Sequence, residues 1–182
     1  MAIWFTADHH FGHENIIRYC DRPFKTVNEM NRVMTDRWNE VVKPDDTVYV
    51  VGDFSLADHA EVYVSKLNGR EILFVPGSHD GWMKRILTRY EGDPWERTRI
   101  LSPIQELKGY GIPIVLGHYA MRTWPGSFHG SLHLYGHSHG RLEKTRLPRS
   151  MDVGVDTNDF YPYRLDGIDI ERLMDEDGYD RG

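Results

Sequence analysis

The chain has 182 residues and a formal net charge of −6, and 40% of its residues are hydrophobic. A chain of this length is expected to form one domain and to bury about 70% of its unfolded surface, so it needs no disulfides for stability. The negative charge excludes a protein that binds DNA or RNA through a broad basic face, and it favours a smaller substrate.

Five short apolar runs are predicted as buried strands, because they are rich in β-branched, aromatic and aliphatic residues and are bounded by turn residues. In chain order these runs are residues 3–7, 47–51, 71–75, 112–116 and 131–135. Shorter runs predict further strands at residues 99–101, 104–107 and 150–155. Strands are therefore expected along most of the chain.

Helices are expected between the early strands. The clearest is residues 27–42, whose apolar residues recur at helical spacing and which Pro44 ends, so it should pack one face on a sheet. Shorter helices are expected over residues 58–68 and 83–90. The chain thus alternates strands and helices at first and then consists mostly of strands.

The sequence also predicts organisation and location. One domain is expected over residues 1–174, since no repeat or linker divides it, and an acidic tail over residues 175–182 is expected to fray. The single cysteine, Cys20, suits a reducing compartment. The first residues lack the features of a signal peptide, and no apolar run has the length of a membrane span. We therefore expect a cytoplasmic protein without a membrane partner, and its oligomeric state stays open.

Residues of the types that bind metal ions follow each of the five main predicted strands. In chain order, the clusters are Asp8-His9-His10, Gly52-Asp53, Gly77-Ser78-His79-Asp80, Gly117-His118 and Gly136-His137-Ser138-His139. Open α/β sheets bind ligands at the carboxyl ends of their strands, so we expect these clusters to meet. Carboxylates and imidazoles suit manganese, iron or zinc, whereas a thiolate site would need more cysteines. Asp53 is the candidate bridge between two cations, because a carboxylate can offer one oxygen to each.

The five clusters resemble the signature of the calcineurin-like metallophosphoesterases, which reads D-x-H, G-D, G-N-H-D/E, G-H and G-H-x-H. Order and approximate spacing agree from residue 8 to residue 139. One such short block is weak support for a family, but five in order are specific. The resemblance implies an α/β fold, a four-layer sandwich of two mixed β-sheets flanked by helices.

The same resemblance implies a site with two divalent metal ions, manganese first, with iron, zinc or nickel as alternatives. The ligands of the first metal are expected to be Asp8, His10, Asp53 and His139. Those of the second are expected to be Asp53, Ser78, His118 and His137. By the same resemblance, His79 faces the substrate and assists the leaving group without binding metal. Asp80 would orient His79 and raise its basicity.

The implied reaction is hydrolysis of a phosphate ester by a hydroxide that bridges the two metals. Two cations about 3.5–4 Å apart lower the pKa of a bound water, which falls from about 15.7 to about 7 on a single catalytic zinc. The hydroxide attacks phosphorus in line, and no covalent enzyme intermediate is needed. The substrate partner is expected to be a phosphodiester, small or cyclic nucleotides included, with phosphomonoesters as the alternative.

Ser78 departs from the signature, which has Asn at this position. Three explanations fit the sequence: natural variation with a water in the gap, a loss that weakens the second metal, or a deliberate substitution that impairs catalysis. The departure favours a second class of function, a catalytically impaired or non-catalytic scaffold that makes protein contacts. The intact histidine ligands and His79 favour the enzyme.

Three residues near the clusters are expected to contact substrate. His13 and Asn15 belong to a segment that resembles H-F-G-H-x-N-I in a subset of the family, and His13 would stand at a helix N-terminus, where anions are favoured. Helix capping is the alternative role for both. Arg122 follows His118 closely and would grip a second phosphate or the non-bridging oxygens in a bidentate way.

Other polar and aromatic residues have a simpler expected role. His9 and His133 are expected to be structural, because His9 points away from its neighbours on an extended segment. The basic run Arg141, Lys144, Arg146 and Arg149 is expected to form a solvated hairpin, with anion binding as the alternative. Aromatic residues in the cluster loops would either stack a nucleobase or shield the loops from water.

Overall fold

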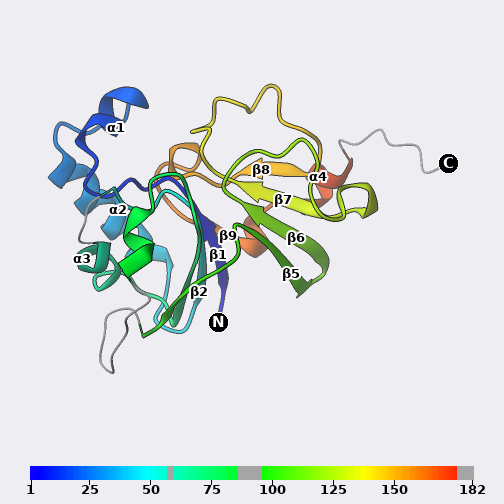
Figure 1. Cartoon of the computed structure of the whole chain (residues 1–182), viewed down its shortest axis with the longest axis horizontal. Coiled ribbons are helices and arrows are strands. Elements are labelled where there is room, and N and C mark those ends of the chain that lie inside the picture. The colour runs from blue at the N-terminus through cyan, green and yellow to red at the C-terminus, as the bar shows by residue number, and fades with distance from the viewer. Residues whose placement is uncertain (57–59, 86–95, 176–182) are drawn as a thin grey trace.

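Two mixed β-sheets form the centre of the computed structural model, which describes residues 1–56, 60–85 and 96–175 (Figure 1). Their strand orders are β4-β3-β2-β1-β9 and β5-β6-β7-β8. The first sheet consists of β1 (Ile3–Thr6), β2 (Thr47–Val51), β3 (Glu71–Val75), β4 (Thr98–Ile100) and β9 (Tyr163–Arg164). The second consists of β5 (Ile104–Tyr110), β6 (Ile112–Gly117), β7 (Leu132–Tyr135) and β8 (Ser150–Asp152). One strand of each sheet, β9 and β5, pairs antiparallel, and the others are parallel. The predicted fold class is confirmed.

The two sheets share a hydrophobic core between their inner faces. Alternate residues of the first sheet, such as Phe5 and Leu73, point inward and pack with Ile114 and Leu134 of the second sheet. All four are less than one tenth exposed. Because successive strand residues face opposite sides, this packing fixes the direction in which the next residue of each strand points.

Helices cover the outer face of the first sheet (Figure 1). They are α1 (Glu14–Tyr19), α2 (Val27–Val41) and α3 (Ala60–Val64). Met30, Met34 and Trp38 of α2 are fully buried against outward residues such as Val50. The Thr26 side chain accepts a hydrogen bond from the Glu29 amide and so caps the start of α2.

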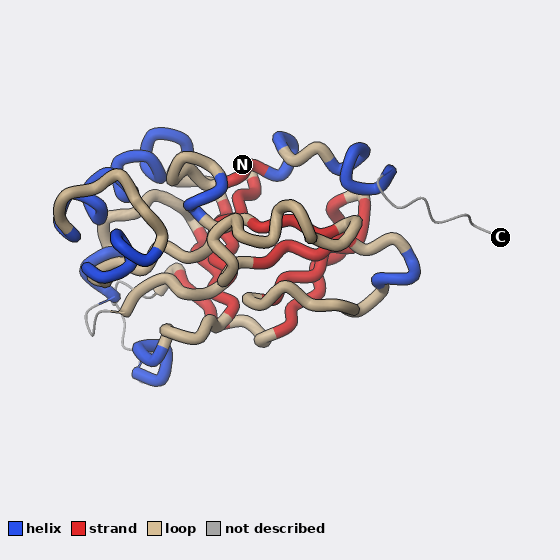
Figure 2. The backbone as a smooth tube through the Cα atoms, turned by 90° about the horizontal axis from the view of Figure 1, so that it is seen from above, coloured by secondary structure: helices blue, strands red, loops and turns tan. Residues whose placement is uncertain are grey.

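Loops cover the outer face of the second sheet. Trp124 packs on His133, with ring centroids 5.1 Å apart, and its indole nitrogen donates to the Ser131 hydroxyl at 3.0 Å. The short helix η2 (Ser127–His129) lies in the same loop. Figure 2 shows the strands in the middle of the molecule, with helical segments at both ends. This loop layer therefore packs on outward side chains of β7 such as His133.

Most predicted elements form where the sequence places them, with differences at their ends. Residues 153–155 were expected to extend a strand, but β8 stops at Asp152 and η3 (Val155–Thr157) follows. Residues 141–149 form successive turns and not a hairpin. The described part of the expected helix 83–90 is the 3-10 helix η1 (Gly81–Arg85). The rest of that helix, residues 57–59 and the tail beyond residue 175 lie outside the described residues.

The edge strand β9 has no clear signal in the sequence, and neither do two further elements. These are the 3-10 helix η4 (Leu165–Gly167) and the helix α4 (Ile170–Asp175), of which Leu173 packs with the core between the sheets. None of the helices in the three described ranges is long and apolar enough to cross a membrane.

The buried His133 should make stability depend on pH. Its Nδ1 lies 3.1 Å from the Val115 carbonyl, and its Nε2 lies 3.1 Å from the Tyr119 carbonyl and 3.3 Å from the Met121 amide. Burial lowers the pKa of His133 below the ordinary 6.5. Below that pH, the His133 ring therefore binds a proton in the unfolded chain but not in the folded chain. The stabilisation is complete above the ordinary pKa and is lost as the pH falls.

We predict that the free energy of unfolding falls between about pH 7 and about pH 5, by at most ~1.4 kcal/mol per pH unit for this one group. His133→Phe cannot titrate, so its free energy of unfolding, measured in urea at several pH values, should fall less steeply. The exposed His129→Gln is the matched control and should keep the wild-type slope. Equal slopes for wild type and His133→Phe would contradict this origin of the pH dependence.

Candidate metal centre

The five sequence clusters meet where the strands of both sheets end. Three groups of side chains have ligand atoms that lie within 4.8 Å of one another: Asp8, His10 and His139; Asp53, His118 and His137; and Cys20, His139 and Asp156. The first two consist of predicted ligands, and we call them the first and second groups. Asp53 also approaches the first group, because its Oδ2 lies 3.7 Å from Nε2 of His10 and 3.3 Å from Nε2 of His118. The carboxylate of Asp53 thus stands between the two groups.

Five of these residues have a left-handed backbone. Their φ angles lie between 49° and 67°: Asp8, His10, Asp53, His137 and His139. Such angles are uncommon for residues other than glycine and cost on the order of 1–3 kcal/mol each. Strain of this kind gathers at functional sites, where surrounding contacts hold it in place. Five of the nine non-glycine residues with positive φ in the described chain are therefore predicted metal ligands.

Two glycines allow the clusters to approach closely. A Cβ at Gly77 would clash with the amide and carboxylate of Asp53. A Cβ at Gly136 would lie 2.7 Å from the Ala7 side chain and 2.9 Å from Oδ2 of Asp8. Any larger residue at these two positions would push the third and fifth clusters away from the carboxylates.

Several ligand atoms are buried without a hydrogen-bond partner among the described residues. These atoms are Oδ1 of Asp8, both ring nitrogens of His10 and Nε2 of His118. In His118, Nδ1 lies 3.0 Å from the Val51 carbonyl and must donate to it, which leaves a lone pair on Nε2 facing Asp53. Buried polar atoms normally have partners, so this set fits bound cations.

Burial raises the pKa of the Asp8 carboxyl to about 7, although His139 and His118 nearby lower it. Burial also acts against the ionised form of Asp53. The nearby His118 ring, whose Nε2 lies 3.3 Å from Oδ2, and the hydrogen bond from the His79 amide outweigh that effect and lower the pKa of Asp53. Opposite charge close to Asp8 would keep both carboxylates ionised at neutral pH.

An ion pair that the motifs do not contain supports the first group. Arg22 is 5% exposed and pairs with both carboxylate oxygens of Asp156, each at 2.8 Å. It also donates to the carbonyls of Asp8 and His9. Asp156 in turn lies 2.7 Å from Nδ1 of His139, which directs Nε2 of that ring toward the first group.

Charge couples Asp156 and His139 strongly. Burial acts against both charged forms, but the hydrogen bond and the attraction between them lower the pKa of Asp156 to about 2 and raise that of His139 to about 10. Sequence reasoning missed this pair. Asp156 carries a weak signal, because it follows the last predicted strand as the other ligands follow theirs. Arg22 carries none.

Asp152 is a second residue that sequence reasoning missed. Its carboxylate accepts from the Ser138 hydroxyl at 2.7 Å, the Gly140 amide at 2.9 Å and the Gly154 amide at 2.8 Å. These three bonds hold the turn that carries both histidines of the fifth cluster.

The expected pairing of Asp80 with His79 is wrong in the structure. The Asp80 carboxylate accepts from the amides of Asp53, Phe54 and Gly77 and from the Trp82 indole, at 2.8–2.9 Å. Asp80 is buried beneath the loops, whereas the His79 side chain is exposed, so the two side chains separate. Asp80 therefore holds the second and third clusters together.

His79 and Ser78 both bond to Asp53. The His79 amide donates to Oδ1 of Asp53 at 2.8 Å, and its ring lies 5.3 Å from that of His10. The Ser78 hydroxyl donates to Oδ2 of Asp53 at 3.0 Å. This bond uses the hydroxyl hydrogen and places the side chain beside the group of Asp53, His118 and His137.

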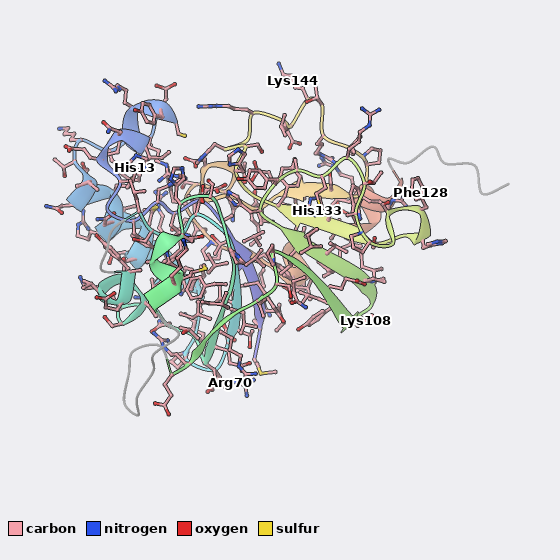
Figure 3. All side chains as sticks on the ribbon, in the orientation of Figure 1. His13, Arg70, Lys108, Phe128, His133 and Lys144 are labelled. Atoms are coloured by element: carbon pink, nitrogen blue, oxygen red, sulfur yellow. The ribbon has the colours of Figure 1, made fainter. Side chains whose placement is uncertain are left out.

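The structure separates the three expected substrate residues. The His13 ring lies 5.5 Å from that of His10 and 6.0 Å from that of His79, and it makes no capping hydrogen bond with α1. Figure 3 shows His13 beside α1, on the side of the molecule where the helices lie. Asn15 is exposed on α1, and Arg122 is exposed in the loop after His118. Of the three, only His13 makes a ring contact with the centre.

The aromatic loop residues divide into two kinds. Phe11, Trp82 and Trp124 are buried and shield the loops, as the simpler expectation held. Tyr119 is 53% exposed, and its ring lies 4.6 Å from that of His137. An exposed ring beside a ligand of the second group is available for stacking.

Comparison with known proteins places this geometry in a family. The chain is 33% identical over 175 residues to an uncharacterized protein of Methanocaldococcus jannaschii, a match that covers 91% of this chain and 88% of that one. No family model matches. A solved structure of a protein of unknown function from Aquifex aeolicus has the same fold, with a TM-score of 0.69, 23% identity, and coverage of 96% of this chain and 98% of that one.

A solved phosphoesterase from E. coli is more distant, with a TM-score of 0.43, 17% identity, and coverage of 85% of this chain and 78% of that one. A likeness this low carries no conclusion about activity. The archaeal relative shows a shared family, and the five ordered clusters converge on one site. The chain belongs to the family of the Methanocaldococcus protein.

Proposed function

We propose that the protein is a phosphoesterase that works with two divalent cations, manganese first, with iron, zinc or nickel as alternatives. The observation that carries this proposal is the set of buried ligand atoms without partners between two sheets. Hard carboxylate and imidazole ligands of this kind suit these metals. The strained backbone at five of the same residues supports the same conclusion.

Each of the two groups of side chains is proposed to hold one metal ion. Asp8, His10 and His139 would hold the first cation, and His118 and His137 would hold the second, with Asp53 between them. Ser78 would stand on the second side, where its hydroxyl bonds to Asp53. Bound cations supply positive charge that acidifies water and neutralises phosphoryl oxygens.

His79 is proposed as the general acid. Its ring is exposed beside His10 and His13, and its amide is fixed on Asp53, so its position is set from the backbone. It would protonate the departing ester oxygen. Asp80 positions His79 indirectly, because it holds the loop in which His79 lies. His13 is proposed to contact the substrate from the other side.

Phosphodiesters are the proposed substrates, with phosphomonoesters as the second choice. Within the described ranges the centre is bordered by exposed side chains, including His79 and Tyr119, and this openness suits the two substituents of a diester. Tyr119 would stack a base or another ring of the ester. Arg122 and Asn15 are proposed as outer contacts.

Two proposals concern organisation. Residues 1–174 are proposed as one domain, because one core joins residues of both sheets. The cytoplasm is proposed as its location from the single cysteine.

A catalytically impaired scaffold is the second candidate function. Ser78 favours it, because a serine hydroxyl that donates to Asp53 is a weaker ligand than the oxygen of an amide side chain. The position of the exposed His79 ring beside the rings of His10 and His13 favours the enzyme.

Replacing Ser78 should raise activity. We predict that Ser78→Asn increases kcat/KM on the diester bis(4-nitrophenyl) phosphate by roughly 10-fold, because the amide oxygen adds a metal ligand. The kcat/KM of this variant on the diester should also exceed its kcat/KM on the monoester 4-nitrophenyl phosphate. The assay supplies Mn, Fe, Ni and Zn separately. Ser78→Ala, which removes the hydroxyl without adding a ligand, is the control and should not be faster than wild type. Inactivity of wild type and Ser78→Asn on both esters with every metal would end the enzyme proposal.

Loss of the His79 ring should slow the reaction without loss of metal. We predict that His79→Gln lowers kcat by roughly 10²–10⁴, the range for general acid–base groups, while elemental analysis finds the wild-type metal content. The exposed His129→Gln is the control for loss of a histidine. Metal content that falls together with activity would show that His79 is a ligand.

Asp156 should tune the first metal through His139. We predict that Asp156→Asn weakens binding of Mn²⁺ by roughly 10–100-fold, because the hydrogen bond that directs His139 loses its charge. Calorimetry with Mn²⁺ measures this affinity without turnover. Asp166→Asn removes an exposed carboxylate that pairs with Arg164 and should bind like wild type. An unchanged affinity of Asp156→Asn would rule out this role.

A further inference from the structure

A separate cavity of about 400 Å³ lies over the outer face of the second sheet. Three segments line it: the loop after His118, the outward residues of β7 and β8, and the turns that follow the fifth cluster. Its lining residues are Ala120, Met121, Arg122, Tyr135, Leu142, Thr145, Arg146, Leu147 and Ser150. None of them belongs to the two groups of metal ligands. We call this cavity the Arg122 pocket.

The Arg122 pocket is positive. Its lining contains two arginines, Arg122 and Arg146, and no acidic residue, although the whole chain carries a net charge of −6. The other large cavity, about 480 Å³, also contains two arginines, but four acidic residues offset them. A third cavity, also of about 400 Å³, contains Arg97 and no acidic residue, but the Arg97 guanidinium already donates to three backbone carbonyls. Among these three cavities, the Arg122 pocket is the one that suits an anion.

The two arginines differ in how firmly they are held. The Arg146 side chain is 9% exposed, and its Nη1 donates to the Ser150 carbonyl at 3.1 Å, which fixes the guanidinium in the wall. Glu143 approaches its Nε at 3.5 Å from outside the pocket. Arg122 is exposed, and its guanidinium makes no hydrogen bond or ion pair with the described residues. Arg122 can therefore turn both nitrogens toward a bound anion.

Tyr135 is a buried residue in the wall of the pocket. The side chain is 1% exposed, and its hydroxyl lacks a hydrogen-bond partner within the described chain. The nearby Ser138 hydroxyl donates to Asp152 instead. A buried donor without an acceptor is uncommon and favours an anionic oxygen or a water here.

The Arg122 pocket lies close to the proposed second metal along the chain. Tyr135 precedes His137 by two residues, a span of at most about 7 Å. Arg122 follows His118 by four residues, a span of at most about 14 Å. Two phosphate groups of one nucleotide-sized molecule can lie this far apart, one at the metal centre and the other in the pocket. Apolar side chains, among them Leu142 and Leu147, would contact the uncharged part of that molecule.

We propose that the Arg122 pocket binds a second phosphate of the ester substrate while the scissile phosphodiester lies at the metal centre. This inference rests on the proposed function and narrows its substrate class to phosphodiesters that carry a further phosphate on the same molecule. Arg122 contacts that phosphate from the open side, and Arg146 with Tyr135 forms the wall behind it.

Counting bound phosphate tests the pocket without turnover. Equilibrium dialysis of the metal-loaded protein with labelled inorganic phosphate should find two phosphates per wild-type chain, one at the metals and one in the pocket. Arg122→Ala should bind one. Lys144→Ala is the matched control, because Lys144 is an exposed cation of the same turns that does not line the pocket, and it should bind two (Figure 3). One phosphate per wild-type chain, or equal binding by wild type and Arg122→Ala, overturns the proposal.

A matched pair of esters tests the link to the substrate. Thymidine 5′-(4-nitrophenyl phosphate) and its 3′-phosphorylated form differ by one phosphate. Arg122→Ala should lose at least about 10-fold more kcat/KM on the 3′-phosphorylated ester than on the plain one, and Lys144→Ala should keep the wild-type ratio. Equal losses on both esters overturn the proposal. Two bound phosphates on a protein that hydrolyses neither ester would instead contradict the proposed function alone.

Discussion

The buried ion pair between Arg22 and Asp156 holds the two ends of the metal centre together. The two residues are 134 positions apart, and each contacts a different part of the candidate ligand set. Arg22 donates to the carbonyls of Asp8 and His9, while Asp156 bonds to His139. Burying two charges costs free energy that good geometry and further hydrogen bonds must offset, and Arg22 has both. Loss of Arg22 or Asp156 would leave an unpaired charge beside the first group of ligands. The segments that carry Asp8 and His139 would then no longer be held together.

This constraint explains how the centre tolerates its strain. Asp8 and His10 keep left-handed backbones because the carbonyls of Asp8 and His9, in the same turn, are bonded to Arg22. The Asp80 carboxylate holds the backbone of the second and third clusters in a similar way, because it accepts hydrogen bonds from their amides. Two buried side chains outside the ligand set therefore position the ligands through backbone atoms. Such support from surrounding contacts is what strained sites require.

The two sheets contribute different parts of the site. The first carries the carboxylates Asp8 and Asp53, and the second carries His118 and His137, so the core between the sheets sets the spacing of the two proposed metals. The helices α1, α2 and α3 cover the outer face of the first sheet. The outer face of the second has a layer of loops, and Tyr135 and Arg146 meet Arg122 there. This asymmetry places a positively charged pocket beside the ligands of the second sheet.

The sequence by itself determined the strands, the main helix and the list of candidate ligands. The strands 47–51 and 71–75 match β2 and β3 because their apolar runs report burial on both faces. Tertiary structure alone decided that Asp80 bonds to backbone amides and not to His79, that Arg22 meets Asp156, and that Arg122 and Tyr135 line one pocket. Local periodicity depends on neighbours in sequence, whereas these partners are remote in sequence or set by which way a side chain turns. Their meeting follows only from how the two sheets pack.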